Sequence, residues 1–131
     1  MEKIWEEMFE AAKAVLQPRS VSQYVDCGGV AAAVLSKSGN IYTGVCVDTA
    51  CTLGICAERN AIFHMLTLGE HEIDKVLCVM GNGKTGAPCG ACRELMAQLM
   101  AGHYHDIQIM LDYEKEEIVT LGELTPHWWI Q

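Results

Sequence analysis

The chain has 131 residues, of which 50% are apolar, and this is enough material for one hydrophobic core but not for two independent ones. We therefore expect a single domain over residues 1–131. Seventeen acidic against nine basic residues give a formal net charge of −8, so the chain lacks the positive surface that binds a nucleic-acid backbone. A nucleic-acid partner is accordingly not expected.

Seven cysteines are many for this length, but an odd number in a chain that is not loop-rich argues against a disulfide scaffold. Residues 1–16 are acidic and amphipathic, whereas a secretion signal begins basic and continues apolar. The apolar runs are far shorter than the roughly 18 residues that a membrane-spanning helix needs. The sequence predicts a cytoplasmic protein without membrane association, whose thiols are free or bound to metal.

Hydrophobic periodicity predicts the elements in chain order. An amphipathic helix occupies residues 1–16 and ends before Pro18. It is followed by strands at 29–35 and 41–47, a helix at 56–68, a buried strand at 76–80, a helix at 88–102, a strand at 107–111 and an edge strand at 116–120. Two antiparallel strands followed by strands that alternate with helices predict an α/β fold of three layers, in which a mixed sheet of about five strands carries helices on both faces.

Two short cysteine segments each begin a predicted helix: Cys56-Ala57-Glu58-Arg59 and Pro88-Cys89-Gly90-Ala91-Cys92-Arg93. A helix N-terminus favours the thiolate form of cysteine, and the spacing of Cys89 and Cys92 places both on one face of a turn. Three thiolates would leave a fourth zinc position open for water. Glu58 is suited to take a proton from such a water, and Arg59 is suited to donate a hydrogen bond to a ligand sulfur.

Three other interpretations are open. Cys89 and Cys92 alone also match a redox dithiol of the thioredoxin type, although such a site has no use for Cys56 and Glu58. A closed structural zinc site with Cys51 as fourth ligand would leave Glu58 without a role. A non-catalytic binding protein could share the fold. We expect Cys27, Cys46, Cys51 and Cys78 to be small buried apolar residues, with a site hypothesis for Cys46 alone.

The two cysteine segments resemble those of the zinc-dependent cytidine deaminase superfamily, and most of all its small three-cysteine nucleoside deaminases. Thr43-Gly44-Val45, Ala61-Ile62-Phe63 and Leu121-Gly122-Glu123-Leu124 are also similar to that family, so the resemblance spans most of the chain. It implies a three-layer α/β/α fold and one Zn²⁺ per subunit, held by Cys56, Cys89 and Cys92.

The resemblance also implies an activity, the hydrolytic deamination of a cytidine-like aminopyrimidine nucleoside. Zinc-bound hydroxide would attack the amidine carbon, and ammonia would leave after Glu58 had shuttled the proton to the amine. Arg59 would tune the thiolates, and the Ala57 backbone N–H would meet the base carbonyl. No organic cofactor is needed.

The sugar-binding part of the family pattern is altered in this chain. The family typically reads Gly-Val-Asn-Val-Glu, whose Asn and Glu hold the ribose, but the segment here is Gly44-Val45-Cys46-Val47-Asp48. Cysteine is a weak hydrogen-bonding residue, and aspartate is one methylene shorter than glutamate. We expect Cys46 and Asp48 at the substrate, which is either a cytidine-like nucleoside or a modified one of the kind that blasticidin S deaminases accept.

Gly28 occupies the position where the family has an aromatic ring that stacks on the base. Tyr24 replaces that ring only if the preceding loop is shifted, in which case Asp26 or Cys27 faces the ligand. The sequence therefore leaves the identity of base and sugar open, and with it the choice between salvage and detoxification.

The C-terminal Trp129 lies where the family has an aromatic residue that reaches into a neighbouring subunit. The resemblance thus implies a homo-oligomer, either the tetramer usual for the small enzymes or a dimer.

Overall fold

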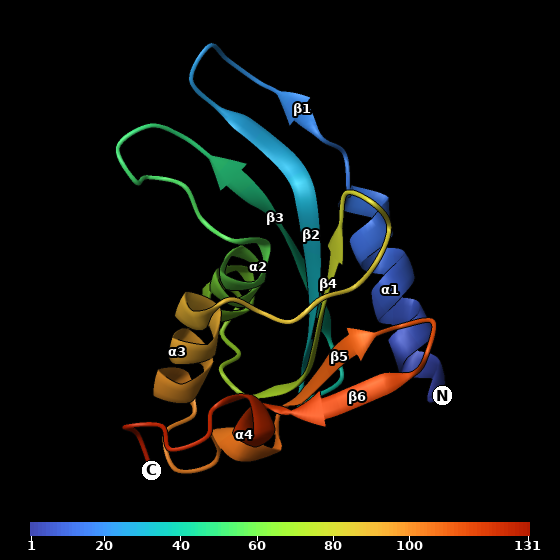
Figure 1. Ribbon diagram of the computed structural model, residues 1–131, viewed down its shortest axis with the longest axis vertical. Helices are drawn as coiled ribbons and strands as arrows, with labels where there is room; N and C mark the ends of the chain where they lie inside the picture. Colours follow the sequence, from blue (N-terminus) through green and yellow to red (C-terminus); the bar gives the residue numbers. More distant parts are fainter.

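A computed structural model describes residues 1–131, and it consists of one mixed sheet with helices packed on its two faces (Figure 1). The helices are α1 (Lys3–Val15), α2 (Ala57–Thr67), α3 (Gly90–Leu99) and the short α4 (Leu121–Leu124), with a 3₁₀ turn at Tyr104–Asp106. The strands are β1 (Arg19–Ser20), β2 (Asp26–Ser36), β3 (Ile41–Asp48), β4 (Ile73–Met80), β5 (Gln108–Asp112) and β6 (Glu117–Thr120).

Strand β2 is the centre of the sheet, since it pairs with β1, β3 and β4. β3 lies along one edge of β2, and β1 and β4 share the other edge one after the other. The sheet continues from β4 to β5 and β6; β4 and β5 are parallel, and all other pairs are antiparallel. This confirms the mixed α/β architecture, with six strands where the sequence predicts about five. The two-residue β1 is the addition, and its exposed residues carry no apolar signal.

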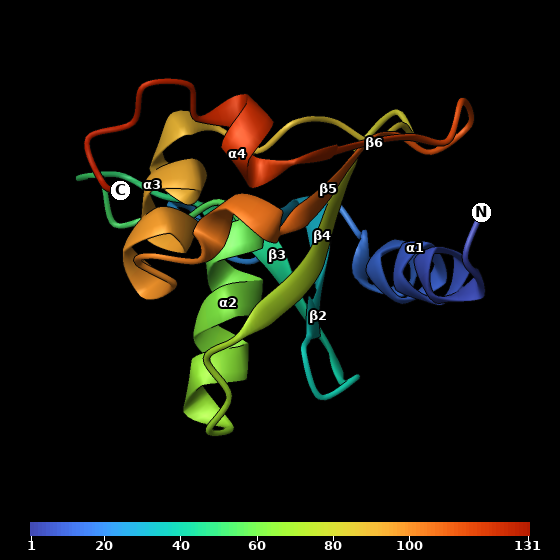
Figure 2. The same cartoon turned by 90° about the horizontal axis from the view of Figure 1, so that it is seen from below.

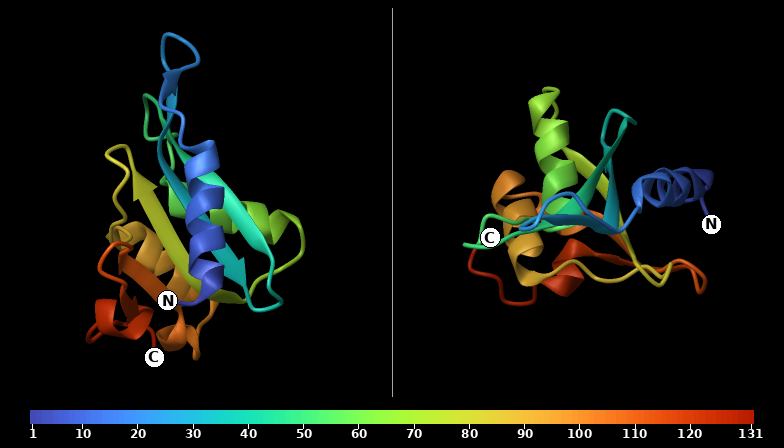
Figure 3. Two further views of the ribbon diagram at one scale, coloured as in Figure 1. Left: turned by 90° about the vertical axis from the view of Figure 1, so that its right-hand side faces the viewer. Right: turned by 90° about the horizontal axis from the view of Figure 1, so that it is seen from above.

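The sheet is buried on both faces, because α1 covers one face while α2 and α3 cover the other (Figure 2, Figure 3). Alternate residues of β2 belong to the two sides: Ala31, Ala33 and Leu35 pack with α1, and Ala32 and Val34 pack under α2. A strand buried on both sides is an unbroken apolar run, as this stretch is in the sequence. The three predicted layers are therefore present.

Some local expectations are corrected. Met80, which ends the buried strand predicted over 76–80, is instead partly exposed, because it is the last residue of β4. The sequence analysis did not predict α4, although its first turn is a capping box in which Thr120 and Glu123 exchange side-chain-to-backbone hydrogen bonds. None of the helices is long and apolar enough to cross a membrane.

An irregularity in the β2–β3 pairing shapes the end of the sheet. Cys27 pairs with Val47 and Ala31 with Val45, so residues 28–30 of β2 stand opposite Cys46 alone. Gly28 has φ +82° here, a conformation that favours glycine. Bulges of this kind re-aim side chains and often lie beside functional sites. The β1–β2 loop and the loop after β3 project from this same end (Figure 1).

Helix α2 lies directly on β3 at Gly44. A Cβ atom built on Gly44 would stand 2.3 Å from the Ala61 backbone N and 2.9 Å from the Ala57 carbonyl O. Both neighbours are helix backbone, which cannot move without moving the whole helix. Glycine at this position therefore sets the height of α2 above the sheet.

We predict that Gly44→Ala lowers the free energy of unfolding by about 1–3 kcal/mol, because it overpacks the β3–α2 contact. Urea denaturation measures the change. Gly90→Ala is the matched control: a Cβ there meets no atom within 4 Å, so no loss is expected. Equal midpoints for Gly44→Ala and the unsubstituted protein would show that the approach of α2 is not close.

Candidate metal centre

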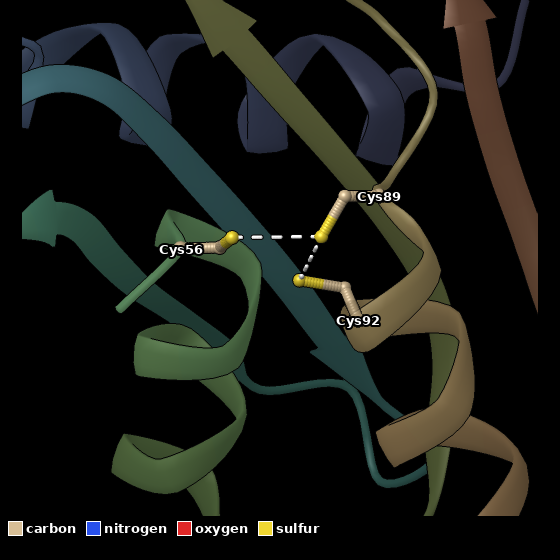
Figure 4. A group of neighbouring side chains, drawn as sticks. All are labelled: Cys56, Cys89 and Cys92. Atoms are coloured by element: carbon tan, nitrogen blue, oxygen red, sulfur yellow. Dashed lines mark hydrogen bonds between the residues drawn. The ribbon is translucent and has the colours of Figure 1, made fainter. Parts of the chain in front are cut away.

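The first turns of α2 and α3 bring three thiols together on one face of the sheet (Figure 4). Cys56 immediately precedes α2 and Cys89 immediately precedes α3, both with extended backbone. Cys92 lies in the first turn of α3 and is buried. The Sγ atoms of Cys56 and Cys89 are 3.5 Å apart, and those of Cys89 and Cys92 are 3.6 Å apart. Cys56 and Cys89, which are 33 positions apart along the chain, thus belong to one cluster.

The spacing of the three sulfurs fits a single zinc ion. Zn–S bonds of about 2.3 Å in a tetrahedron place ligand sulfurs roughly 3.8 Å apart. The Cys56–Cys89 and Cys89–Cys92 sulfur separations are close to this value, and all three Sγ atoms lie within 4.8 Å of one another. No other cysteine, histidine or carboxylate belongs to the group. The donor set is therefore that of a three-ligand site with one position left for water or substrate.

Cys51 is not part of this cluster. Its side chain is exposed in the loop after β3, so the closed four-cysteine alternative is not formed, and the expectation that Cys51 is buried is wrong. Cys78 is buried as expected, whereas Cys27 and Cys46 are only half-buried.

The surroundings of the cluster lower the pKa of the Cys89 thiol and raise the pKa of the Cys92 thiol. Burial opposes ionisation of Cys89, but hydrogen bonds from the Cys92 backbone N–H and from the neighbouring thiols hold the pKa of Cys89 below its usual range. Burial and the negative charge of Glu58 raise the pKa of Cys92. A bound divalent cation lowers the pKa of a coordinating thiol. A bound cation would therefore act against the effect of burial and of Glu58 on Cys92.

Arg59 supplies a positive charge at the cluster. Its Nη2 donates a hydrogen bond to Cys56 Sγ over 3.3 Å, and this bond raises the pKa of the Arg59 guanidinium. Three thiolates around one Zn²⁺ carry a net charge of −1, which the guanidinium offsets. A hydrogen bond to a ligand sulfur also fixes the orientation of that ligand.

Glu58 lies in the first turn of α2 and is only 5% exposed. Burial raises the pKa of its carboxyl, while its own backbone N–H, the charge of Arg59 and the Cys78 thiol act the other way. A buried carboxyl group with a raised pKa, placed beside a metal position, is suited to accepting and returning a proton.

Arg93 has a positioning role that the sequence motif alone does not reveal. Its Nε donates to the Pro88 carbonyl over 2.8 Å, and its Nη1 donates to the Leu124 carbonyl over 2.9 Å. These bonds hold the turn that carries Cys89 against α4. Arg93 and its first acceptor, Pro88, both belong to the cysteine motif, but the second acceptor, Leu124, lies far away in the sequence.

A cavity of about 390 Å³ reaches the cluster at Cys56, and it is also lined by Cys46, Asp48, Thr52 and Arg59. A second cavity, of about 350 Å³, is lined in part by Arg19, Ser20, Asp26, Cys27, Gly29 and Asp48. Asp48 lines both cavities. The structure thus places Cys46 and Asp48 next to the metal cluster.

Tyr24 does not supply the missing aromatic ring. Its side chain is 70% exposed and lines neither cavity. Gly28 cannot carry a ring either, since a Cβ there would lie 2.1 Å from the Gln17 carbonyl O. Asp26 and Cys27, in contrast, both line the second cavity.

Residues 4–104, which include both cysteine segments, match the cytidine and deoxycytidylate deaminase zinc-binding region. The chain belongs to this family. A cytidine deaminase of Halalkalibacterium halodurans is 33% identical over 101 residues, which are 74% of each chain. One of Sporosarcina psychrophila is 32% identical over 98 residues, which are 74% of this chain and 71% of that one.

Solved structures agree with the family and its fold. The cytidine deaminase from Mycobacterium leprae superimposes with a TM-score of 0.75 at 28% identity, covering 94% of this chain and 98% of that one. The enzyme from Burkholderia pseudomallei gives 0.73 at 29% identity, covering 95% and 98%. The resemblance found in the sequence is therefore confirmed, together with the zinc-dependent deaminase class that it implies.

We predict that the purified chain holds one zinc per molecule, and that Cys56→Ser, Cys89→Ser or Cys92→Ser reduces this well below one. Loss of one thiolate removes a third of the protein donor set. Inductively coupled plasma mass spectrometry after dialysis against a competing chelator measures the metal content. Cys51→Ser, the matched control, keeps its zinc; loss of zinc in that variant would mean that the ligand set is different.

Proposed function

We propose that this protein is a zinc-dependent hydrolytic deaminase that releases ammonia from a cytidine-like aminopyrimidine nucleoside. The observation that carries the proposal is the buried carboxyl group of Glu58 beside three convergent thiols. The family membership of the chain supports it, as do the related proteins described as cytidine deaminases.

Cys56, Cys89 and Cys92 are the proposed zinc ligands. Zinc held by three protein ligands supplies Lewis acidity, which makes water a competent nucleophile at neutral pH. The start of α2 and the start of α3 favour the thiolates, and Arg59 holds Cys56 in place through its Nη2.

Glu58 is the proposed proton carrier. Its carboxylate takes the proton of the attacking water and delivers it to the departing amine, so that water is consumed and ammonia leaves. Ala57, fully buried at the start of α2, would donate its backbone N–H to the carbonyl of the base. A backbone N–H in the first turn of a helix has no partner within the helix, so it is free to bond substrate.

Cys46 and Asp48 are the proposed substrate-side residues. They line the cavity that reaches Cys56 and Arg59. The cavity volume of about 390 Å³ falls within the size range of small-molecule sites. A modified nucleoside of the blasticidin S type is a second substrate candidate, because Cys46 and Asp48 depart from the family pattern for ribose.

The negative charge of the chain supports a small nucleoside rather than a polynucleotide as substrate. A formal net charge of −8 opposes binding of a phosphate backbone.

We further propose that the protein acts in the cytoplasm.

Replacing Glu58 tests the proposed chemistry. We predict that Glu58→Gln lowers kcat for ammonia release from cytidine by about 10²–10⁴-fold, because an amide cannot carry the proton. The variant keeps its zinc, since Glu58 is not among the ligand sulfurs. Ammonia is measured with zinc-loaded protein on cytidine, deoxycytidine and modified aminopyrimidine nucleosides. Equal rates for the variant and the unsubstituted protein, or no ammonia from any substrate, would refute the mechanism.

We also propose that the protein is a homo-oligomer, a tetramer or a dimer. Exposed apolar side chains support this, namely Phe63, Leu66 and Leu68 on or just after α2 and Trp129, which is 72% exposed, near the C-terminus. Exposed apolar side chains that gather on one surface mark interaction sites.

Light scattering coupled to size exclusion tests the assembly. The expected mass is two or four times the 14.4 kDa of one chain, and Phe63→Glu is expected to reduce it by burying a charge in the interface. Glu114→Gln, on the exposed β5–β6 loop, is the control that leaves the mass unchanged. A monomer of 14.4 kDa for the unsubstituted chain would contradict the proposal.

A further inference from the structure

The Cys46 thiol makes two hydrogen-bond contacts within the protein. In the irregular β2–β3 pairing, the Val30 backbone N–H donates to Cys46 Sγ over 3.2 Å instead of to a strand carbonyl. The same sulfur lies 4.0 Å from Asp48 Oδ2, within reach of a weak S–H hydrogen bond. Cys46 therefore links the bulge to the Asp48 carboxylate, and its hydrogen-bonding capacity is spent on this link.

Asp48 faces a second carboxylate across the sheet. Asp26 and Asp48 are direct partners in the β2–β3 register, and both line the cavity of about 350 Å³. Like charges directly opposite each other on neighbouring strands are unfavourable. A ligand that brings a positive charge between the two strands relieves this repulsion.

The hydroxyl donors around both cavities already have acceptors. Thr49 Oγ1 donates to the Ala50 carbonyl, Thr52 Oγ1 to the Cys51 carbonyl and Ser20 Oγ to the Ser22 carbonyl. These bonds use the one proton that each hydroxyl group has to give. These three hydroxyl groups therefore offer a ligand acceptors rather than donors.

Each of the two guanidinium groups in the cavities donates one hydrogen bond within the protein. Arg59 Nη2 donates to Cys56 Sγ over 3.3 Å, and Arg19 Nη1 donates to the Gln17 carbonyl over 2.8 Å. Arg59 is thereby directed to the metal end. In the second cavity, the carboxylates of Asp26 and Asp48 outnumber the single guanidinium group of Arg19, so the net charge of its lining is negative.

We propose that Asp48, positioned by Cys46 and reinforced by Asp26, selects a nucleoside whose sugar end carries a cationic amine, and disfavours one that carries a phosphate. This inference rests on the proposed function, since it concerns the far end of the same pocket. Asp48 is the specificity-determining residue, and Cys46 is a positioning residue that acts through it. An ammonium group bonds a carboxylate more strongly than a neutral hydroxyl does, because the hydrogen bond is charge-assisted.

Binding of product analogues to the zinc-loaded protein tests the inference separately from catalysis. Isothermal titration compares uridine, 3′-amino-3′-deoxyuridine, 5′-amino-5′-deoxyuridine and uridine 5′-monophosphate. The expected result is that at least one aminonucleoside binds about tenfold more tightly than uridine, and that the monophosphate binds more weakly. Equal binding of uridine and both aminonucleosides would overturn the inference.

Substitutions test which residues cause the preference for an aminonucleoside over uridine. Asp48→Asn is expected to abolish the amine preference and Asp26→Asn to reduce it, while Asp106→Asn, an exposed carboxylate on the 3₁₀ turn, leaves it unchanged. Cys46→Ser retains the preference, because a hydroxyl can accept from Val30 and donate to Asp48; Cys46→Ala reduces it. An unchanged preference in Asp48→Asn would overturn the assignment.

Ammonia release from the corresponding cytidine analogues separates the two proposals. Turnover of cytidine without an amine preference in binding would overturn this inference and leave the proposed deaminase activity standing. The amine preference in binding without any ammonia release would support the subsite and refute the deaminase activity. No binding of any nucleoside would overturn the inference.

Discussion

The contact between Cys56 Sγ and Cys89 Sγ depends on two helices that begin side by side on one face of the sheet (Figure 4). Helix α2 reaches that level because Gly44 lets its backbone rest directly on β3. Helix α3 is held through the turn before Cys89, where Arg93 bonds both the Pro88 and Leu124 carbonyls. The extended residue at each helix start then directs its sulfur toward the other helix. A shift of either helix by about one turn would separate the thiols by roughly 5 Å.

The start of α2 carries three of the proposed functional side chains, those of Cys56, Glu58 and Arg59. The exposed N–H groups at a helix start favour negative charge, so the same geometry that gathers the sulfurs also favours their ionisation. Glu58 follows Cys56 by two positions and is buried against the sheet, while Arg59 returns to Cys56. Ligand, proton carrier and compensating charge are thus consecutive parts of one helical turn. The far end of the pocket is built differently, from strand pairing rather than from helix starts.

Much of the metal half could be predicted from the sequence because its signals are local. Cys89 and Cys92 are separated by less than one helical turn, and the helix around them follows from apolar periodicity. The continuous apolar strands 29–35 and 76–80 likewise predicted a sheet covered on both faces. The sequence could not place Asp26 opposite Asp48, because that pairing depends on a bulge three residues long on β2. Nor could it show that Val30 engages the Cys46 thiol, since a thiol beside a strand has the same signature as a buried apolar residue.

The central claim is that three thiolates, and only three, bind the zinc and leave one position for water or substrate. X-ray absorption at the zinc edge of the zinc-loaded protein tests this most directly. The account predicts three sulfur neighbours at about 2.3 Å and one oxygen or nitrogen neighbour at about 2.0 Å. A first shell of four sulfurs would mean a closed structural site, and it would contradict the account.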